Sequence, residues 1–530
     1  MFEGAHDFQI IDSSFILNTL SSDNDATSRA RSEHPGESLF ERDWRIQSFY
    51  TTATDWALMI GLEKLLHHSM RDAFHDSSGR WPPPRCHYES RLEIRAMIVS
   101  WGIRSSRAIQ KHLLWMYGPF GVGKSAVAQS CAEALEEEGK LIASLFFSRV
   151  NRRKNPNRVF TSIAYQLALS CPLLKSVLNR IIMNNPTLLT ASLPRQFLEL
   201  VVKPVRRVLS KAPSLKGRII ILDGLDEVDG AEAQCDIIDI IATSIRDRAT
   251  PFRWFLLSRP EPHLQRAMDD DNVTPLLHSI QLSPSPEDEH EILLFYMAEL
   301  KKIGAKYKLP PTWWSEADLA MLVKSSQRLW IYASTVARFI GDPNSLGPAA
   351  RFRRVLALAQ QQIRSPAANP LAAIDVFYDL IMQQVPADIA LIFRKILYFK
   401  SIPHIQQLGG VELFHIVNIL GLNSEEMYSA CGFFQSVAFV THPEGYPSLN
   451  LYHASFLEFI QEPGRSGRFC LGDLSDNLRE ELIDRVNDVH AGSSVGTSSN
   501  SNSVSGTDSA KLTGFMFRKD DCGPTHNDAS

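Results

Sequence analysis

One short stretch of the sequence has the residues of a phosphate-binding loop. It begins at Gly118 as Gly-Pro-Phe-Gly-Val-Gly-Lys-Ser and ends in Lys124 and Ser125. Glycines let the backbone curl so that its N–H groups point at phosphate oxygens, where side chains would block the approach. The lysine reaches the terminal phosphates, and the serine hydroxyl is a ligand for Mg²⁺. The residues expected to contact a bound nucleotide are Gly118, Pro119, Phe120, Gly121, Val122, Gly123, Lys124, Ser125 and Ala126.

The flanking residues supply the elements that such a loop requires. An apolar run over residues 113–117 predicts a buried strand, and the alanine-rich segment after residue 124 predicts a helix. The helix N-terminus adds the positive end of its dipole to the anion site. The alternative, a chance match in a surface turn, does not explain both flanks.

A second buried strand is expected to end in acidic residues. Residues 218–222 lead directly into Asp223, and ligands bind at this carboxyl edge of an open parallel sheet. Asp223 is expected to hold Mg²⁺ opposite Ser125. Asp226 and Glu227 are expected to position or deprotonate the attacking water. An acidic surface turn is the competing explanation.

A third strand, over residues 253–258, is expected to end at Arg259. A guanidinium at that edge can sense a γ-phosphate, because its paired N–H groups match two phosphate oxygens. A salt-bridged surface arginine is the competing explanation. Together the three strand ends predict a site for Mg²⁺ with a nucleotide.

Arginines and lysines also follow the strand expected over residues 141–147. No aromatic residues that could stack with bases are interleaved with them, so a solvated loop is favoured over a contact with nucleic acid. The basic residues are Arg149, Arg152, Arg153, Lys154 and Arg158.

The composition restricts the classes of protein to which the chain can belong. Its 530 residues carry a net charge of -4, which gives no overall electrostatic argument for binding nucleic acid or an anionic membrane. Seven scattered cysteines without a Cys-x-x-Cys pair indicate a reducing compartment. The N-terminus has no signal-peptide pattern, and no apolar run approaches the ~18 residues of a membrane span. We therefore expect a cytoplasmic protein.

The patterning divides the chain into segments. We expect an α/β fold, a P-loop NTPase parallel sheet flanked by helices, followed by a helical domain and a winged-helix domain. A turn-rich linker is expected over residues 341–348, and the next helix from residue 373. The expected segments are 1–55, poorly ordered; 56–85, a linker helix running to Phe74 and a proline-rich stretch; 86–283, the NTPase domain; 284–345, helical; 370–470, winged-helix-like; and 488–530, a disordered Ser/Asn/Gly-rich tail.

These motifs resemble the NACHT-type P-loop NTPases of the STAND class, and more closely the fungal group related to the nephrocystin N-terminal NTPase domain. The resemblance covers roughly residues 60–470 and includes Tyr-His-Ala-Ser-Phe-Leu-Glu-Phe from residue 452. It implies a switch in which ADP holds a closed monomer and ATP promotes self-association, with slow hydrolysis and an unidentified protein partner. It also implies that His453 contacts the β-phosphate of ADP, and a role in fungal self/non-self or immune-like signalling.

The sequence departs from the family at residues 328–333, which leaves the contacts to the base open. The residues after His453 are too few for a repeat array of three units, which is the pattern expected of a truncated paralogue. A non-hydrolysing nucleotide-binding or interaction scaffold is therefore the main alternative. A metabolic kinase is a weaker one, since no acceptor-binding signature is present.

Overall fold

The computed structural model describes residues 60–104, 111–343, 347–364, 370–402, 413–442, 447–474 and 478. The expectations for residues 1–55 and 488–530 therefore lie outside the described residues. Within the described residues, no helix combines the length and the apolar character needed to cross a bilayer.

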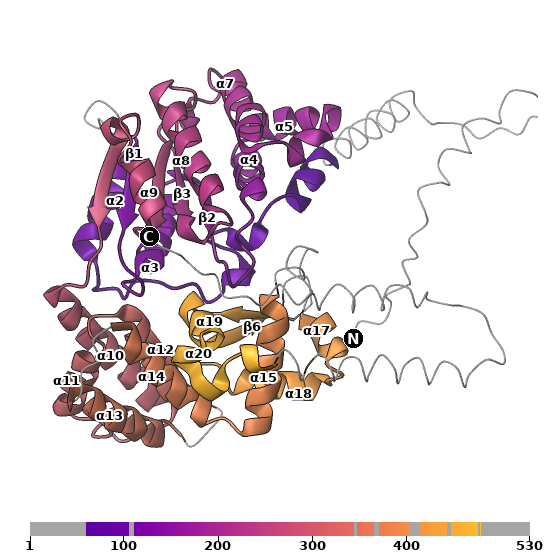
Figure 1. The fold of residues 1–530 in the computed structure, drawn as a ribbon. Coiled ribbons are helices and arrows are strands. Elements are labelled where there is room, and N and C mark those ends of the chain that lie inside the picture. Colours follow the sequence, from indigo (N-terminus) through magenta and orange to yellow (C-terminus); the bar gives the residue numbers. More distant parts are fainter. Residues whose placement is uncertain are drawn as a thin grey trace, which may run out of the picture. The chain divides into compact units, whose positions relative to one another are not determined.

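Five parallel strands form the central sheet, in the order β2-β3-β4-β1-β5 (Figure 1). The first four are buried on both faces, as near-continuous apolar runs predict. Helices connect the strands and cover the sheet, so the expected α/β fold is confirmed. The strands are β1 (Leu113–Tyr117), β2 (Leu141–Phe146), β3 (Ile219–Asp223), β4 (Arg253–Ser258) and β5 (Leu277–Gln281).

The pairing register aligns the ends of the strands that were predicted to carry the site. Tyr117 at the end of β1 is paired with Ser258 at the end of β4. Asp223 at the end of β3 is paired with Leu257 of the same β4. The phosphate loop, Arg259 and the acidic turn therefore leave the sheet at one edge, side by side.

Alternating strand residues pack on the two helical layers. Leu114 and Ile221 belong to the core on the side of α2 and α3, whereas Trp115 and Leu222 belong to the core on the side of α4 and α8. The helices of this part are α2 (Leu92–Ile103), α3 (Lys124–Glu137), α4 (Val159–Ser170), α5 (Pro172–Asn184), α6 (Leu193–Gln196), a π-helical turn (Phe197–Val202), α7 (Lys203–Val208), α8 (Ala231–Arg246) and α9 (Pro262–Met268).

The expected linker helix is shorter than predicted. It is described from residue 60 and ends at residue 67, and a 3-10 turn follows at Arg71–Ala73. The reason is a tertiary contact, because the Met70 backbone N–H donates to the Ser162 hydroxyl of α4 at 2.8 Å. This bond turns the chain onto α4 before Phe74 is reached.

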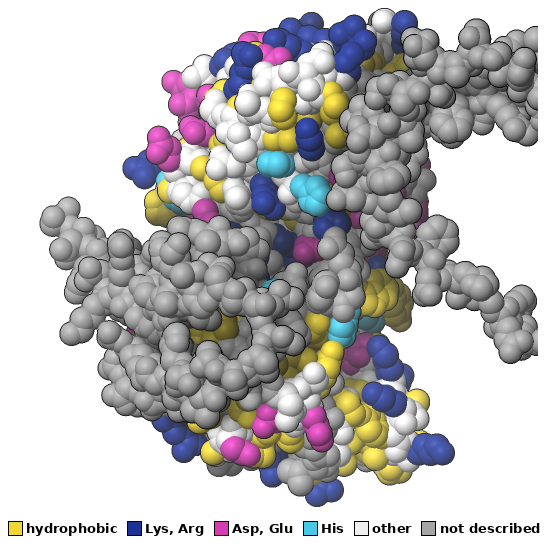
Figure 2. All heavy atoms as spheres, turned by 90° about the vertical axis from the view of Figure 1, so that its right-hand side faces the viewer, with side chains coloured by type: hydrophobic (Ala, Val, Ile, Leu, Met, Phe, Trp, Pro, Cys, Tyr) yellow, Lys and Arg dark blue, Asp and Glu magenta, His cyan; other side chains and the backbone are white. Residues whose placement is uncertain are grey.

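The near-neutral total charge conceals an uneven distribution. Between residues 171 and 218 the sequence has nine basic residues and one acidic residue, Glu199. Lys203, Arg206 and Arg207 of α7 are exposed, and Figure 2 shows Lys and Arg side chains gathered at the end of the molecule where Figure 1 labels α7. The net charge of -4 therefore does not describe each face of the molecule.

A second group of helices follows the sheet. One of them, α13, was not predicted. No element was assigned between the linker expected over residues 341–348 and the helix expected from residue 373. The inward face of α13 includes Arg351, which is 4% exposed and donates to the carbonyls of Phe339 and Asp342 at 2.8 Å each. A buried arginine interrupts the apolar pattern that would have indicated the helix. The helices are α10 (Pro286–Lys306), α11 (Glu316–Ser325), α12 (Trp330–Gly341) and α13 (Pro348–Arg364).

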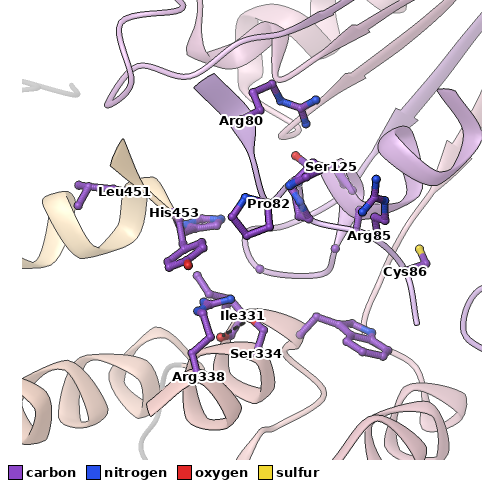
Figure 3. Close-up of a pocket in the computed structure, with 18 of the residues that line it drawn as sticks. Arg80, Pro82, Arg85, Cys86, Ser125, Ile331, Ser334, Arg338, Leu451 and His453 are labelled. Carbon is purple, nitrogen blue, oxygen red and sulfur yellow. Dashed lines mark hydrogen bonds between the residues drawn. The ribbon is translucent and has the colours of Figure 1, made fainter. Parts of the chain in front are cut away.

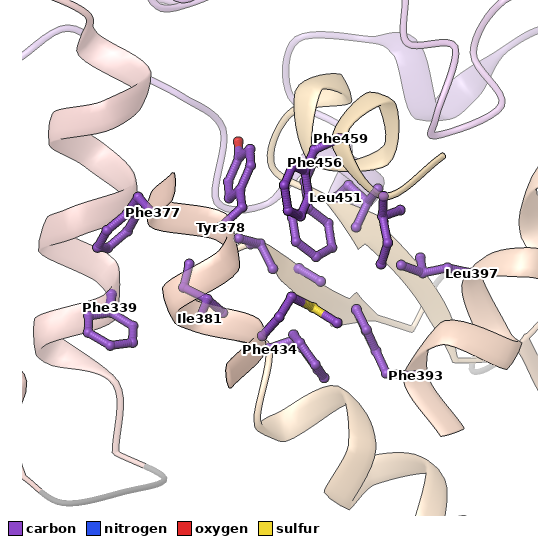
Figure 4. Packing of buried hydrophobic residues seen from close by; sticks show 14 of the residues in the cluster. Phe339, Phe377, Tyr378, Ile381, Phe393, Leu397, Phe434, Leu451, Phe456 and Phe459 are labelled. Atoms are coloured by element: carbon purple, nitrogen blue, oxygen red, sulfur yellow. The ribbon is translucent and has the colours of Figure 1, made fainter. Parts of the chain in front are cut away.

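The last part consists of helices followed by an antiparallel hairpin and a further helix, in the order the sequence predicted. Aromatic residues fill its core (Figure 4), where Phe393 stacks on Phe434 with ring centroids 3.9 Å apart. Phe339 of α12 meets Phe377 of α14 at 5.4 Å, so both helical groups share one core. The elements are α14 (Pro370–Gln383), α15 (Ala387–Ser401), α17 (Leu413–Ile419), α18 (Ser424–Gly432), β6 (Ala438–Thr441), β7 (Ser448–Leu451), α19 (Ala454–Gln461) and α20 (Pro463–Ser466).

The phosphate loop leaves β1 at a position that only glycine can occupy. A Cβ on Gly118 would lie 2.0 Å from the carbonyl oxygen of Leu282. We expect Gly118→Ala to lower the free energy of unfolding by about 2–4 kcal/mol, since the backbone at Leu282, just after β5, must shift. Gly139→Ala is the control, because a Cβ there meets no atom within 4 Å, and its positive φ should cost only about 1 kcal/mol. Chemical denaturation of both variants tests this, and equal losses would contradict it.

Candidate functional site

The predicted phosphate-binding loop joins β1 to α3. Gly121 and Gly123 have φ angles of 76° and 93°, a region that favours glycine. The Lys124 ammonium donates to the carbonyls of Gly118 and Pro119, at 2.8 and 2.9 Å, so it folds back over its own loop. Burial lowers the pKa of Lys124 to about 8, against the opposing charges of the acidic turn. The ammonium is therefore held in a poorly solvated position at the mouth of the loop.

The loop is also the place where α12 meets the sheet domain. The Gly121 carbonyl accepts a hydrogen bond from the Ile331 N–H at 3.2 Å. A Cβ on Gly121 would lie 2.6 Å from the Ile331 side chain, and one on Gly123 would lie 3.7 Å from Trp330. The start of α12 therefore packs directly on the phosphate loop. Trp330 and Ile331, from the stretch whose contacts to the base were left open, line the cavity.

Ser125 and Asp223 lie together, as predicted for a magnesium site. Asp223 is 3% exposed and accepts a hydrogen bond from the Ser125 side chain. Burial raises the pKa of Asp223 to about 6, while Ser125 and Arg80 oppose the shift. A hydroxyl and a carboxylate are oxygen donors of the kind that Mg²⁺ prefers.

Asp226 and Arg259 form an ion pair between adjacent strand ends. One oxygen of Asp226 accepts from the Arg259 backbone N–H at 2.9 Å, and the other lies 3.3 Å from Arg259 Nε. Arg259 Nη2 also donates to Glu458 of α19 at 3.2 Å. Burial would lower the pKa of Arg259, but the carboxylates of Glu458, Asp226 and Glu227 outweigh it and raise the pKa. Asp226 is thus occupied in holding the arginine.

Glu227 is held by the loop that follows β2. Its carboxylate accepts from the Arg149 backbone N–H at 2.9 Å, while the Arg149 guanidinium donates to the Asp226 carbonyl at 2.9 Å. Burial, and then repulsion by Asp226, raises the pKa of Glu227 to about 7. A carboxyl group that titrates near neutral pH is suited to take a proton from water.

The basic loop that was predicted to be solvated also contacts the site, since Arg149 is exposed but bonds to the acidic turn and Arg153 is only partly exposed. Ser148 and Arg153 exchange two backbone hydrogen bonds of 2.9 Å, which close the loop into a tight turn. Arg153 donates to the Asp72 carbonyl at 3.1 Å, and burial lowers the pKa of Arg153 to about 10. The position of the loop in the sequence could have indicated these contacts. The loop leaves the carboxyl end of β2, which lies next to the end of β3 that carries the acidic residues.

Arg80 is a site residue that the sequence analysis did not single out. It is 5% exposed and lies 3.6 Å above the ring centroid of Phe146. It donates to the Gln129 side chain at 2.6 Å and to the His75 carbonyl at 3.0 Å. Burial lowers the pKa of Arg80 to about 9, while the charge of Asp223 opposes this. Nothing in the local spacing indicated the arginine, because its side-chain partners, Gln129 and Phe146, are distant in the sequence.

His453 approaches from the C-terminal part. It is the N-cap of α19, and its ring Nδ1 accepts from the Ser455 backbone N–H at 3.2 Å. Because that nitrogen accepts, the neutral ring carries its proton on Nε2. Burial, together with Arg259 and Lys124, lowers the pKa of His453 well below its usual range. The ring meets Phe120 of the loop edge-on, with centroids 4.4 Å apart.

These groups line one cavity of about 1000 Å³ (Figure 3). Figure 3 shows Ser125, His453 and Arg338 reaching it from the loop, from the start of α19 and from α12. Gly118 and Pro119 contribute carbonyls to Lys124. The other predicted residues line the cavity itself: Phe120, Gly121, Val122, Gly123, Lys124, Ser125, Ala126, Asp223, Asp226, Glu227, Arg259 and His453.

The chemistry of the walls fits a nucleotide with Mg²⁺. Lys124, Arg80 and Arg259 bring cations to the end of the cavity where the loop amides lie, as phosphates require. Ser125 and Asp223 supply oxygen donors beside them. The fold and this arrangement define a P-loop NTPase.

Comparison with known proteins shows which P-loop NTPase family part of the chain resembles. Residues 98–259 match the family described as Nephrocystin 3, N-terminal, so the expected resemblance is confirmed for this part of the chain. Among solved structures, Cdc6p from Pyrobaculum aerophilum is 13% identical at a TM-score of 0.33, over 76% of this chain and 96% of that one. The ADP form of Aeropyrum pernix ORC2 is 13% identical at 0.34, also over 76% and 96%. No curated protein matches the sequence.

The raised pKa of Glu227 predicts a pH-dependent stability. Its folded pKa of about 7 lies above the ordinary 4.5, so the folded state binds more protons between these values and stability falls as pH rises through them. We expect Glu227→Gln to stabilise the nucleotide-free protein by about 1–2 kcal/mol at pH 8 relative to pH 5, after allowance for solvent screening. Chemical denaturation of the wild type and the variant at pH 5 and at pH 8 tests this. The exposed Glu232→Gln should show no such difference, and a pH-independent effect of Glu227→Gln would contradict the assignment.

Proposed function

We propose that the chain is a nucleotide-dependent switch of the NACHT (STAND) type, which binds Mg-ATP or ADP and hydrolyses ATP slowly. The observation that carries the proposal is the cavity, which is lined both by the phosphate loop and by His453 at the start of α19. A ligand between two packed parts stabilises whichever arrangement it contacts better. Replacing one nucleotide by the other therefore changes how the C-terminal part docks.

The residues have distinct roles in this proposal. The loop amides and Lys124 hold the phosphates, and Ser125 and Asp223 hold Mg²⁺, which when bound neutralises phosphate charge. Glu227, with its pKa near neutrality, orients and deprotonates the attacking water. Asp226 keeps Arg259 in place through both of its oxygens. The geometry thus supports Glu227, rather than Asp226, as the base.

His453 supports a closed state with ADP. Its Nε2–H is free of the bond that Nδ1 makes to Ser455, and the neutral ring can donate it to a β-phosphate oxygen. The helices, the hairpin of β6 and β7 and then α19 support a winged-helix assignment for this part. The rest of the proposal is based on the resemblance alone. It comprises self-association with ATP, an unidentified protein partner and a role in fungal self/non-self signalling.

Lys124→Ala tests nucleotide binding. We expect it to weaken ATP and ADP binding by at least about 100-fold, since a charge-assisted phosphate contact is lost. Equilibrium binding of labelled nucleotide, with a thermal shift in Mg-ATP, measures this. Lys211→Ala, exposed beyond the end of α7, is the control. Undiminished binding by Lys124→Ala would contradict the site, and binding without turnover in the wild type would favour the scaffold over the ATPase.

His453→Ala tests the closed state. We expect ADP to dissociate about ten times faster, because a hydrogen bond to a charged phosphate is lost. Stopped-flow displacement of a fluorescent ADP analogue measures the rate, and mass photometry measures assembly. His442→Ala is the matched control, since His442 follows β6 in the hairpin that precedes α19 and bonds to Tyr428 at 2.9 Å. An unchanged ADP dissociation rate in His453→Ala would refute the proposed contact.

A further inference from the structure

Arg259 is shared between the NTPase domain and the C-terminal part. Its Nε lies 3.3 Å from Asp226, whereas its Nη2 donates to Glu458 of α19 at 3.2 Å. The two carboxylates therefore engage different nitrogens of one guanidinium. The side chain of Arg259 is 25% exposed, and that of Glu458 is 39% exposed, so the outer contact is open to competition.

We propose that Glu458 sets the discrimination between nucleoside triphosphate and diphosphate, by competing with the terminal phosphate for Arg259. This inference rests on the proposed function of the site. Arg259 leaves β4 between the strand that carries the phosphate loop and the strand that ends in Asp223. Lys124 and Arg259 line the same cavity, and the proposal requires that only the third phosphate of a triphosphate reaches the guanidinium.

The competition follows from the geometry of the guanidinium. Asp226 holds Arg259 through its backbone N–H and through Nε, so the side chain cannot swing away to serve a phosphate elsewhere. The two terminal nitrogens are left for a phosphate, and Glu458 uses one of them, Nη2, so a bidentate phosphate contact through both must displace Glu458. A phosphate carries more charge than a carboxylate and is the better acceptor for this fork. Binding of a triphosphate therefore releases Glu458.

The release acts on the segment that carries His453. On one side of the histidine, the Asn151 side chain exchanges two hydrogen bonds of 3.0 Å with the Leu451 backbone. On the other side, Glu458 is held by Arg259. The Asn151 contact is uncharged and involves no phosphate-binding residue. A triphosphate thus breaks the contact between Glu458 and Arg259 and leaves the contact between Asn151 and Leu451 in place.

The expected size of the effect follows from exposure. A partly exposed ion pair is worth a factor of about two to five in an equilibrium. We expect Glu458→Gln to raise the preference for ATPγS over ADP, measured as the ratio of dissociation constants with Mg²⁺, by about this factor. Glu462→Gln, the same change at an exposed position just beyond α19, should leave the ratio unaltered.

A second variant separates discrimination from docking. Asn151→Ala removes the uncharged contact and should weaken docking of α19 with either nucleotide, so its ratio of dissociation constants stays at the wild-type value. Hydrogen exchange of residues 454–461 in the full chain gives an independent readout. In the wild type ATPγS should speed this exchange and ADP should not, whereas in Glu458→Gln the exchange should be fast already with ADP.

The outcomes distinguish the inference from the proposed function. If the wild type binds both nucleotides but Glu458→Gln keeps the wild-type ratio, the inference is overturned and the switch stands. If the wild type binds neither nucleotide, both fall. Glu458→Asp, which withdraws the carboxylate by one methylene, should move the ratio in the same direction as Glu458→Gln. This keeps the test decisive should the amide variant fold poorly.

Discussion

The ion pair between Asp226 and Arg259 is the contact on which the rest of the cleft depends. Asp226 is 6% exposed, and a carboxylate buried to this degree is strongly destabilising unless it is paired. Pairing it with the backbone and side chain of Arg259 joins the end of β3 to the end of β4. The same bonds fix the direction of the guanidinium, and so determine which groups it can reach.

The part of the site that the sequence predicted is the part built on strand ends. Apolar runs identify β1, β3 and β4, and in a parallel sheet their carboxyl ends share one edge. It follows that Lys124, Asp223 and Arg259 meet, without knowledge of any side-chain contact. The glycines were predictable for a local reason as well, because the turn from β1 into α3 places Gly121 and Gly123 at positive φ angles.

The parts that could not be predicted depend on contacts between distant residues. Arg259 and Glu458 are separated by 199 positions, and no local pattern marks them as partners. Arg80 is a buried cation and Arg153 a partly exposed one, and both donate to backbone carbonyls, whereas composition alone assigns arginine to the surface. The helix α13 escaped prediction for a similar reason, since Arg351 lies where an apolar residue would have marked its inner face.

The charges of the cleft support the proposal that a nucleotide binds there together with Mg²⁺. Burial is the main cause of each shift, raising the pKa of Asp223 and lowering the pKa of Lys124. Ionised groups of both signs are therefore poorly solvated there, and each is stabilised by a ligand charge of opposite sign. Phosphates alone would favour Lys124 but oppose Asp223, whereas a bound cation reverses the second effect. In this proposal, only a nucleotide bound together with Mg²⁺ stabilises the ionised forms of both Lys124 and Asp223.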